Sequence, residues 1–327
     1  MTLRGLNACD ESGKQHGSRG TLDKQVRLAR LMVERAIIGI GGFFLLLLLE
    51  AVCPFRPPVD SRWRRYAINL FITGSNALLL SVLLGGLIVS AYHAFELRRI
   101  GLLHRLGIGG WWNVALTIVL LDGVTYIWHR AYHGLPLMWR MHRVHHSDLD
   151  LDVTTSGRFH LAEMVLSALF RLGIIALWGA SVAGVVIFEI VFGLFNQLEH
   201  ANLHLPEPFE TRLRAIFVTP DMHRIHHSQV AEHTNSNYST IFSFWDRLFG
   251  TYRFGAEQQT LTIGLPEYPR ADDVTFGKVL ALPLGPPCAF TEMLRSNISS
   301  TSRLAFNGAD HRGEGRACPP GGGELFE

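Results

Sequence analysis

The chain lacks the short motifs of several common enzyme classes. Its 327 residues contain no HExxH pattern, no GxGxxG loop, no P-loop and no GxSxG elbow. These absences leave a zinc protease of the usual kind, a nucleotide-binding fold and a serine hydrolase without support. Charged residues are also scarce, at 18% against roughly 25% in soluble domains, whereas apolar residues make up 48%. This composition predicts an integral membrane protein.

Cysteine and lysine are both rare. The cysteines, Cys9, Cys53, Cys288 and Cys318, form no close pair, which excludes a disulfide framework and a four-cysteine iron–sulfur cluster and suits a reducing compartment. Only three of the 30 basic residues are lysines, a bias that favours a GC-rich bacterial source. The formal net charge of +2 argues against a nucleic-acid-binding surface.

Five apolar stretches are candidate transmembrane helices. They are residues 36–53, 67–92, 113–128, 161–179 and 181–199. A helical span needs about 20 apolar residues, so the third stretch, which also contains Asp122, is short. The sequence therefore predicts an all-α polytopic membrane protein with about four to five transmembrane helices. Residues 1–30 are expected to be a polar tail without a cleavable signal peptide, and residues 299–327 a disordered tail.

The last two apolar stretches are predicted to form a helical hairpin. The run 161–199 is too long for one span and has Gly179 and Gly184 near its middle. The flanking residues His160 and His200 would then lie at one membrane face. We expect that face to be cytoplasmic, because electrons for an oxidative site come from there.

The orientation of the N-terminus leaves two alternatives. Residues 1–35 hold seven Arg or Lys, which favours a cytoplasmic N-terminus, whereas three spans before His129 would put the N-terminus on the face opposite that histidine. A re-entrant or strongly tilted pair at 67–92 would reconcile the two. Otherwise the basic tail lies outside.

Histidines are concentrated in one part of the chain. Twelve of the 16 fall between His129 and His233. Most lie in four boxes: HRAYH at 129–133, HRVHH at 142–146, HANLH at 200–204 and HRIHH at 223–227. Residues three and four apart share a helix face, so the rings of a box can converge. Since imidazole is the commonest metal ligand among side chains, this density predicts a metal site.

The number of box histidines indicates which metal they bind. A catalytic zinc uses about three protein ligands and a closed zinc site four, so ten rings are too many for one zinc. Two metals of higher coordination number match the set, and nitrogen ligation of a redox metal that binds dioxygen points to iron. The alternatives are a zinc-dependent membrane hydrolase and a non-catalytic metal binder or transporter, whose ligands would lie at mid-membrane.

The region around the boxes resembles a known family. HRAYH, WRMHRVHHSDLDLDVTTSGRFH, NQLEHANLH and MHRIHHS followed by HTNSNYSTIFSFWDRLFGTYRF are similar to motifs of the fatty acid hydroxylase superfamily, in particular the sterol desaturase family. The resemblance covers residues 120–254. It implies a membrane enzyme that uses dioxygen, two iron ions and electrons from a separate donor protein to hydroxylate or desaturate a lipid. The chain departs from the family at Ser156-Gly157, Leu161 and Ser239, where Ala-Leu, Pro and Gly are usual.

Carried onto this chain, the resemblance implies a membrane di-iron domain at 31–298 with the boxes on a helical cytoplasmic cap. The implied metal ligands are His129, His133, His142, His145, His146, His200, His204, His223, His226 and His227. The metal centre itself would be the catalytic group, and the expected location is a bacterial inner membrane. The implied substrate is a bilayer lipid, sterol-like or acyl. Hydroxylation is slightly favoured over desaturation, which requires a second hydrogen abstraction held in register.

Two further histidines are candidate partners of the ligand rings. Metal-bound imidazoles usually donate their second N–H to a neighbouring group. His160 and His233 are expected to orient a ligand in this way, with direct ligation or a surface position as the alternatives.

Two polar residues inside the apolar stretches are candidates as well. Asn196 lies four residues before His200 on one helix face. It is expected either to hydrogen-bond a ligand ring or a water molecule, or to serve only in helix packing. Asp122 lies seven residues before His129 on the same face, and is expected to hydrogen-bond that ring, because acids within a span are costly and usually functional.

Overall fold

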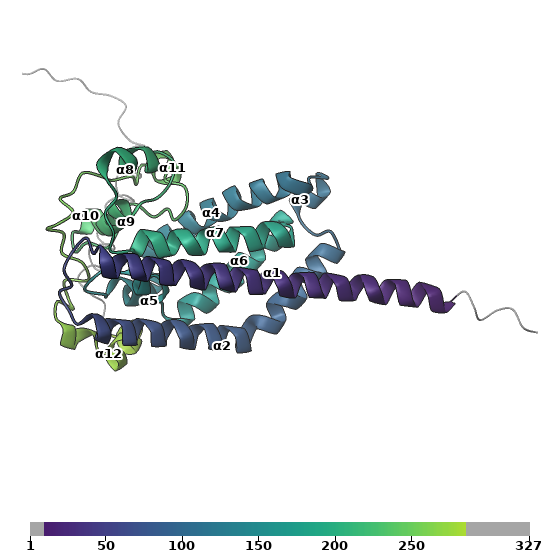
Figure 1. Cartoon of the computed structure of the whole chain (residues 1–327), viewed down its shortest axis with the longest axis horizontal. Helices are drawn as coiled ribbons and strands as arrows, with labels where there is room; N and C mark the ends of the chain where they lie inside the picture. The colour runs from purple at the N-terminus through teal and green to yellow at the C-terminus, as the bar shows by residue number, and fades with distance from the viewer. Residues whose placement is uncertain (1–9, 286–327) are drawn as a thin grey trace, which may run out of the picture. The chain divides into compact units, whose positions relative to one another are not determined.

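The structure, a computed structural model, describes residues 10–285, and five long helices form its framework (Figure 1). They are α1 (Asp10–Val52), α2 (Arg62–Leu97), α4 (Gly110–Gly134), α6 (Leu161–Trp178) and α7 (Val182–His200). Within residues 10–285 there is no β-strand, and only two isolated bridges join Phe217 to Phe242 and Ser228 to Ile263. The predicted all-α class is confirmed.

Each long helix contains a segment apolar enough to cross a membrane. The segments are Val33–Val52, Arg62–Tyr92, Gly110–Gly134, Leu161–Trp178 and Val182–His200. All five predicted stretches fall largely within them, and the third is a full-length helix of 25 residues rather than a short one. Large apolar side chains such as Phe44, Leu48 and Val82 are exposed on these helices, as expected where lipid replaces water. The protein is a multi-pass membrane protein.

The path of the long helices brings all four histidine boxes to one end of the bundle. α1, α4 and α7 run toward that end, and α2 and α6 run away from it (Figure 1). α2 is one continuous helix from Arg62 to Leu97, which does not fit a re-entrant pair. If all five helices cross the bilayer, the start of α1 lies at the face opposite the boxes.

The turn between α6 and α7 confirms the predicted hairpin. Gly179 ends α6 with a φ of 79°, a left-handed conformation that favours glycine. The Ser181 hydroxyl then caps α7 by accepting a hydrogen bond from the backbone N–H of Gly184 at 3.1 Å. A Cβ on Gly179 would lie 2.9 Å from the carbonyl oxygen of Ile100. Position 179 therefore also requires glycine because the backbone just before α3 (Leu102–Arg105) passes close to it.

Short helices form a cap at the histidine end of the bundle, as predicted. They are α5 (Pro136–His146), η1 (Val153–Gly157), α8 (Glu207–Leu213), α9 (Pro220–His226), α10 (Ala231–Thr234), α11 (Phe244–Leu248), η2 (Ala271–Val274), α12 (Phe276–Ala281) and η3 (Leu282–Leu284). α5 and α9, which carry the two HxxHH boxes, each begin with proline. Proline is suited to the first helical turn because its missing N–H would have no helical partner there.

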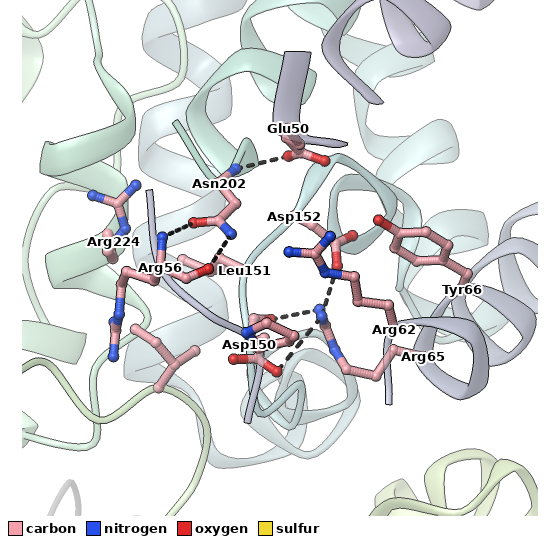
Figure 2. Close-up of a pocket in the computed structure, with 12 residues that line it drawn as sticks. Glu50, Arg56, Arg62, Arg65, Tyr66, Asp150, Leu151, Asp152, Asn202 and Arg224 are labelled. Carbon is pink, nitrogen blue, oxygen red and sulfur yellow. Dashed lines mark hydrogen bonds and ion pairs between the residues drawn. The ribbon is translucent and has the colours of Figure 1, made fainter. Parts of the chain in front are cut away.

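A buried ionic cluster ties α2 to the loop that follows α5. The Arg65 guanidinium lies 2.7 Å from the Asp148 carboxylate and 2.6 Å from that of Asp152, and Figure 2 shows the side chain of Arg65 among the acids of this loop. Burial alone would raise the pKa of Asp148, but Arg65 and Arg158 hold it below its usual range. The carboxylate therefore stays charged, which fixes the loop beside the HRVHH box.

α1 is joined to the same region through Glu50. Its carboxylate accepts a hydrogen bond from the backbone N–H of Val153 at 2.8 Å. It accepts a second from the backbone N–H of Asn202 at 2.7 Å, which Figure 2 shows. One side chain thus links the end of α1 to η1 and to the residues just after α7. α1 and α2 are thus each linked to segments that adjoin the histidine boxes.

The predicted tails are only partly described. Residues 10–30 of the predicted polar N-terminal tail are helical, as the first part of α1. The expected disordered tail at 299–327, and the last residues of the predicted domain 31–298, lie outside the described residues.

Candidate metal centre

Nine of the ten predicted ligands converge into two groups. The nitrogen atoms of each group lie within 4.8 Å of one another. The first group is His129, His133, His142, His146 and His226, and the second is His145, His200, His223 and His227. All are buried except His129, which is half-buried.

The two HxxHH boxes contribute to both groups. In α5, His142 and His146 are four residues apart and belong to the first group, whereas His145 belongs to the second. In the HRIHH box the assignment is the opposite: the single histidine, His226, belongs to the first group, and the pair four residues apart, His223 and His227, belongs to the second. Residues four apart share a face of a helix, so each box divides between two adjacent metal positions.

Backbone carbonyl groups fix the orientation of three rings. Nδ1 of His129 lies 2.9 Å from the Tyr238 carbonyl oxygen, and Nδ1 of His226 lies 2.7 Å from that of Ser236. Nδ1 of His200 donates in the same way to the Asn196 carbonyl at 2.6 Å. A carbonyl only accepts, so Nδ1 carries the proton in each ring, and Nε2 is left with a lone pair that points into its group.

These Nε2 atoms lie closer together than is expected for nitrogens whose lone pairs point at one another with nothing between them. Nε2 of His200 is 3.1 Å from Nε2 of both His145 and His223, and Nε2 of His129 is 3.2 Å from Nε2 of His142. Two nitrogens bound at right angles, each about 2.1 Å from one metal, would be about 3.0 Å apart. The spacing fits rings that share a cation.

Several buried ring nitrogens have no partner among the described residues. They include both nitrogens of His146 and the Nε2 atom of His226. A buried polar atom without a hydrogen bond costs about 1–3 kcal/mol, and native proteins leave few of them. A metal would satisfy these atoms, so the donor set fits metal binding.

The cap histidines are also in the protonation state that metal binding requires. Burial lowers the pKa of His142 to about 3. Burial, followed by the neighbouring rings, holds the pKa values of His145, His146, His223 and His227 well below their usual range. Neutral imidazole is the ligand form, and burial keeps these rings neutral at pH 7.

Two buried carboxylates contact the rings from outside the groups. Oε1 of Glu163 lies 2.7 Å from Nδ1 of His142. Glu199 lies 3.7 Å from Nδ1 of His223 and 3.9 Å from Nδ1 of His200. Such carboxylates orient a ligand imidazole and increase its basicity. Glu199 was missed by sequence reasoning, although an acid directly before a box histidine was a usable signal.

His204 is the one predicted ligand that the structure does not bring to either group. Its side chain is 39% exposed and its Nδ1 lies 3.0 Å from the Asp221 carboxylate. Its ring stacks on Phe55 with the centroids 4.8 Å apart. α7 ends at His200, so the four-residue spacing in HANLH does not continue along a helix face.

The two candidate partner histidines have other contacts. His160 caps α6, because its Nδ1 accepts a hydrogen bond from the backbone N–H of Ala162 at 3.2 Å. His233 lies 3.1 Å from the Ser228 hydroxyl through its Nδ1. Both are half-buried, and no contact of either with a ligand ring is found among the described residues.

The two polar residues of the spans are placed differently from each other. Asn196 holds His200 through its backbone carbonyl, while its side chain donates to the Ser156 carbonyl at 2.9 Å. Asp122 does not bond His129. Its carboxylate accepts from the backbone N–H groups of Ile241 and Phe242, at 3.1 Å each, and from the Trp245 indole at 2.9 Å. The expected bond to the ring is wrong, because two helical turns separate the residues by about 10.5 Å.

A cavity of about 380 Å³ leads from the histidines into the helix bundle. Rings of both groups line it, including His129 and His200. Farther in, the walls are mainly apolar and come from Leu80, Leu121, Val124, Phe170 and Phe192. An elongated apolar molecule fits such a space, with one end against the rings.

The region that contains the histidine groups is similar in sequence to known proteins. Residues 114–251, which include both histidine groups, match the family model for fatty acid hydroxylase. No solved structure matches the chain.

Three curated proteins illustrate the similarity. An ornithine lipid hydroxylase from Rhizobium tropici is 32% identical over 155 residues, which are 47% of this chain and 45% of that protein. An alkylglycerol monooxygenase from Xenopus tropicalis is 32% identical over 156 residues, 47% and 32% of the two chains. A cholesterol 25-hydroxylase-like protein from Danio rerio is 28% identical over 153 residues, 44% and 56% of the two chains. The match thus spans less than two thirds of each relative.

Proposed function

Because residues 114–251 match the family model for fatty acid hydroxylase, we propose that this chain is an integral-membrane di-iron oxidoreductase that hydroxylates a lipid with dioxygen and external electrons. The observation that carries the proposal is the pair of buried histidine groups, five and four rings, at one end of an apolar cavity. Each group has more nitrogen donors than a catalytic zinc takes.

The proposed ligands are the nine converging histidines, without His204. Iron ions held there would supply the reductive activation of dioxygen that the oxidation of an unactivated C–H bond requires, since no side chain can do this. The protein supports that chemistry in three ways. Carbonyl groups and Glu163 hold the rings with Nε2 directed inward, burial keeps the cap rings neutral, and the apolar cavity excludes water and positions the alkyl chain.

Hydroxylation is the proposed outcome, and desaturation is the alternative. The three relatives described above are named as hydroxylases or monooxygenases, which supports oxygen insertion rather than loss of a second hydrogen. The proposed substrate class is a bilayer lipid, because the cavity lies between helices that expose apolar side chains outward.

The proposed electron source is a separate donor protein. Among the described residues, Cys53 is the only cysteine and it is free, so this part of the chain offers no cysteine-ligated iron–sulfur centre. We further propose that the protein lies in a bacterial inner membrane with the cap in the cytoplasm, where such donors are reduced. With five crossings, the start of α1 would then lie on the periplasmic side.

Two measurements, one on the purified chain and one on cells that express it, test the proposal. Metal analysis should find two irons per chain. Lipids from cells that express the protein under ¹⁸O₂ should contain a species heavier by one labelled oxygen. One zinc without iron, or an oxygen that comes from labelled water, would instead indicate a zinc-dependent hydrolase, and bound metal without any lipid product would indicate a metal binder or transporter.

A further inference from the structure

Three charged side chains line the same cavity far from the histidines. Glu189 of α7 pairs with Arg171 of α6 at 2.7 Å and with Arg35 of α1 at 2.9 Å. All three residues line the cavity. The side chains are 17%, 25% and 41% exposed, respectively, so the cluster is open to the space that it borders.

Glu189 and Arg171 lie well inside their spans, whereas Arg35 lies near the start of the span of α1. Glu189 and His200 are on one helix, eleven residues apart, which separates them by about 16 Å along the axis. The wall between these two ends is mainly apolar, with residues such as Leu80 and Phe192. The cavity therefore has a polar site at each end and an apolar middle.

The charges of the cluster do not cancel. Two guanidinium groups face one carboxylate, and among the described residues Glu189 is the only hydrogen-bonding partner of either arginine. A guanidinium carries five N–H donors, so most of them remain available. Arg171 also lies over the rings of Phe188 and Phe192, with 5.7 and 5.2 Å to the centroids, which holds it in place.

An excess positive charge at this depth needs an anion. An arginine near the centre of a transmembrane helix costs about 2.5–3.5 kcal/mol on insertion scales, and charges of this kind usually face a binding cavity. Both arginines line a cavity that is also lined by histidines of the proposed catalytic centre. A bound anionic group would neutralise the excess and accept these donors.

We propose that Arg35 and Arg171 form a binding site for an anionic oxygen group, a carboxylate or a phosphate, at one end of the lipid substrate. Glu189 positions both guanidinium groups and limits their net charge to one. This inference rests on the proposed function and specifies its substrate class. The lipid would extend along the apolar wall to the histidines, so oxidation would fall on a carbon remote from the anionic group.

The test is equilibrium binding to the purified full chain in neutral detergent at pH 8. The probes are radiolabelled palmitate, hexadecyl phosphate and 1-hexadecanol, which share a 16-carbon chain and differ in the head group. We expect at least one anion to bind about tenfold or more tightly than the alcohol, as one charge-assisted hydrogen bond would give. A preference for only one of the two anions identifies the chemistry of the natural group.

Substitutions test whether the two arginines cause the preference for anions. Arg171→Gln and Arg35→Gln should each reduce the anion preference, and the double variant should remove it. Arg171→Lys should retain part of it. The control is Arg30→Gln, because Arg30 lies one turn before Glu34 on α1, is exposed, and within the described part of the chain forms an ion pair only with Glu34. A thermal melt of each variant shows whether it is folded.

Equal binding of the alcohol and both anions to the unsubstituted protein would overturn the inference, and this result does not depend on any variant. An anion preference that persists in the double variant would also overturn it and leave the cluster as a purely structural link between α1, α6 and α7. Binding requires no turnover. A failure of the oxygenase proposal, seen as missing iron or unlabelled lipid, is therefore distinguishable from a failure of this site.

Discussion

Glu163 places a carboxylate oxygen 2.7 Å from Nδ1 of His142, and this contact joins the first turn of α6 to the HRVHH box. Both side chains are buried. His142 belongs to the five-ring group, with its Nε2 atom 3.2 Å from that of His129. The carboxylate therefore determines which nitrogen of His142 faces the proposed metal.

Removing this carboxylate should weaken metal binding at the first group. We expect Glu163→Leu to reduce iron affinity by about 10 to 100-fold, the range for partners that orient a ligand, and Glu163→Gln to lose less, because an amide oxygen still accepts the Nδ1 proton. Iron titration against a competing chelator measures this. Glu232→Gln is the control, since Glu232 is exposed on the cap. If Glu163→Leu bound iron as tightly as the unsubstituted chain, the carboxylate would have no role in orienting the ring.

The division of the histidines into two groups predicts separable losses of metal. His145→Ala removes a ligand of the second group and His226→Ala a ligand of the first, so each should retain one of two irons and both should lose turnover. His204→Ala should keep both irons, in contrast to what the family resemblance implies. His104→Ala, at the opposite end of the bundle in α3, is the control. Metal content by mass spectrometry, with Mössbauer spectra of ⁵⁷Fe-loaded protein, distinguishes the outcomes. Loss of both irons in His204→Ala would return that residue to the ligand set.

The sequence was sufficient to predict the spans and the nine histidines that converge, for the same physical reason. Apolar length and three- or four-residue spacing are local properties of a helix. The HRVHH box lies within α5, and the HRIHH box lies on α9 except for His227, which follows its last residue. His204 shows the limit. Its spacing from His200 is that of a helix, but α7 ends at His200, and the end of a helix depends on its tertiary contacts.

Contacts between distant segments could not be predicted in this way. Glu163 meets His142 only because α6 packs beside α5, and Asp122 meets the backbone of Ile241 and Phe242 from more than a hundred residues away. A shared helix face indicates direction and not distance, which is why Asp122 was assigned to the wrong partner. The pairing of Arg171 with Glu189 likewise depends on the packing of α6 against α7, which the sequence pattern does not specify residue by residue.

The arrangement of the bundle predicts the accessibility of cysteine labels. Thr211 in α8 and Asp272 in η2 are exposed on the cap, and Arg105 in α3 is exposed at the opposite end. In a chain whose native cysteines are replaced by serine, Thr211→Cys and Asp272→Cys should react alike with a membrane-impermeant maleimide, and Arg105→Cys oppositely. With the cap in the cytoplasm, only Arg105→Cys reacts in intact cells. Opposite labelling of the two cap positions would contradict a single composite metal site.

The lowered pKa values of the cap histidines predict an acid-sensitive fold. His142 has a folded-state pKa of about 3 against an ordinary value of 6.5, because of burial. Below pH 6.5 the unfolded chain therefore binds more protons than the folded one, and the stability contributed by the neutral buried ring is present above pH 6.5 and is lost as the pH falls toward 3. Each such ring costs about 1.4 kcal/mol per pH unit in that window. The metal-free protein should melt at a lower temperature at pH 5.5 than at pH 7.5. Bound iron should reduce this difference at pH values where it stays bound, because the metal competes with protons for the same nitrogens. Thermal melts of both forms across this range measure the effect. A metal-free melting temperature that does not change between pH 7.5 and 5.5 would mean that these rings are not buried in the neutral state.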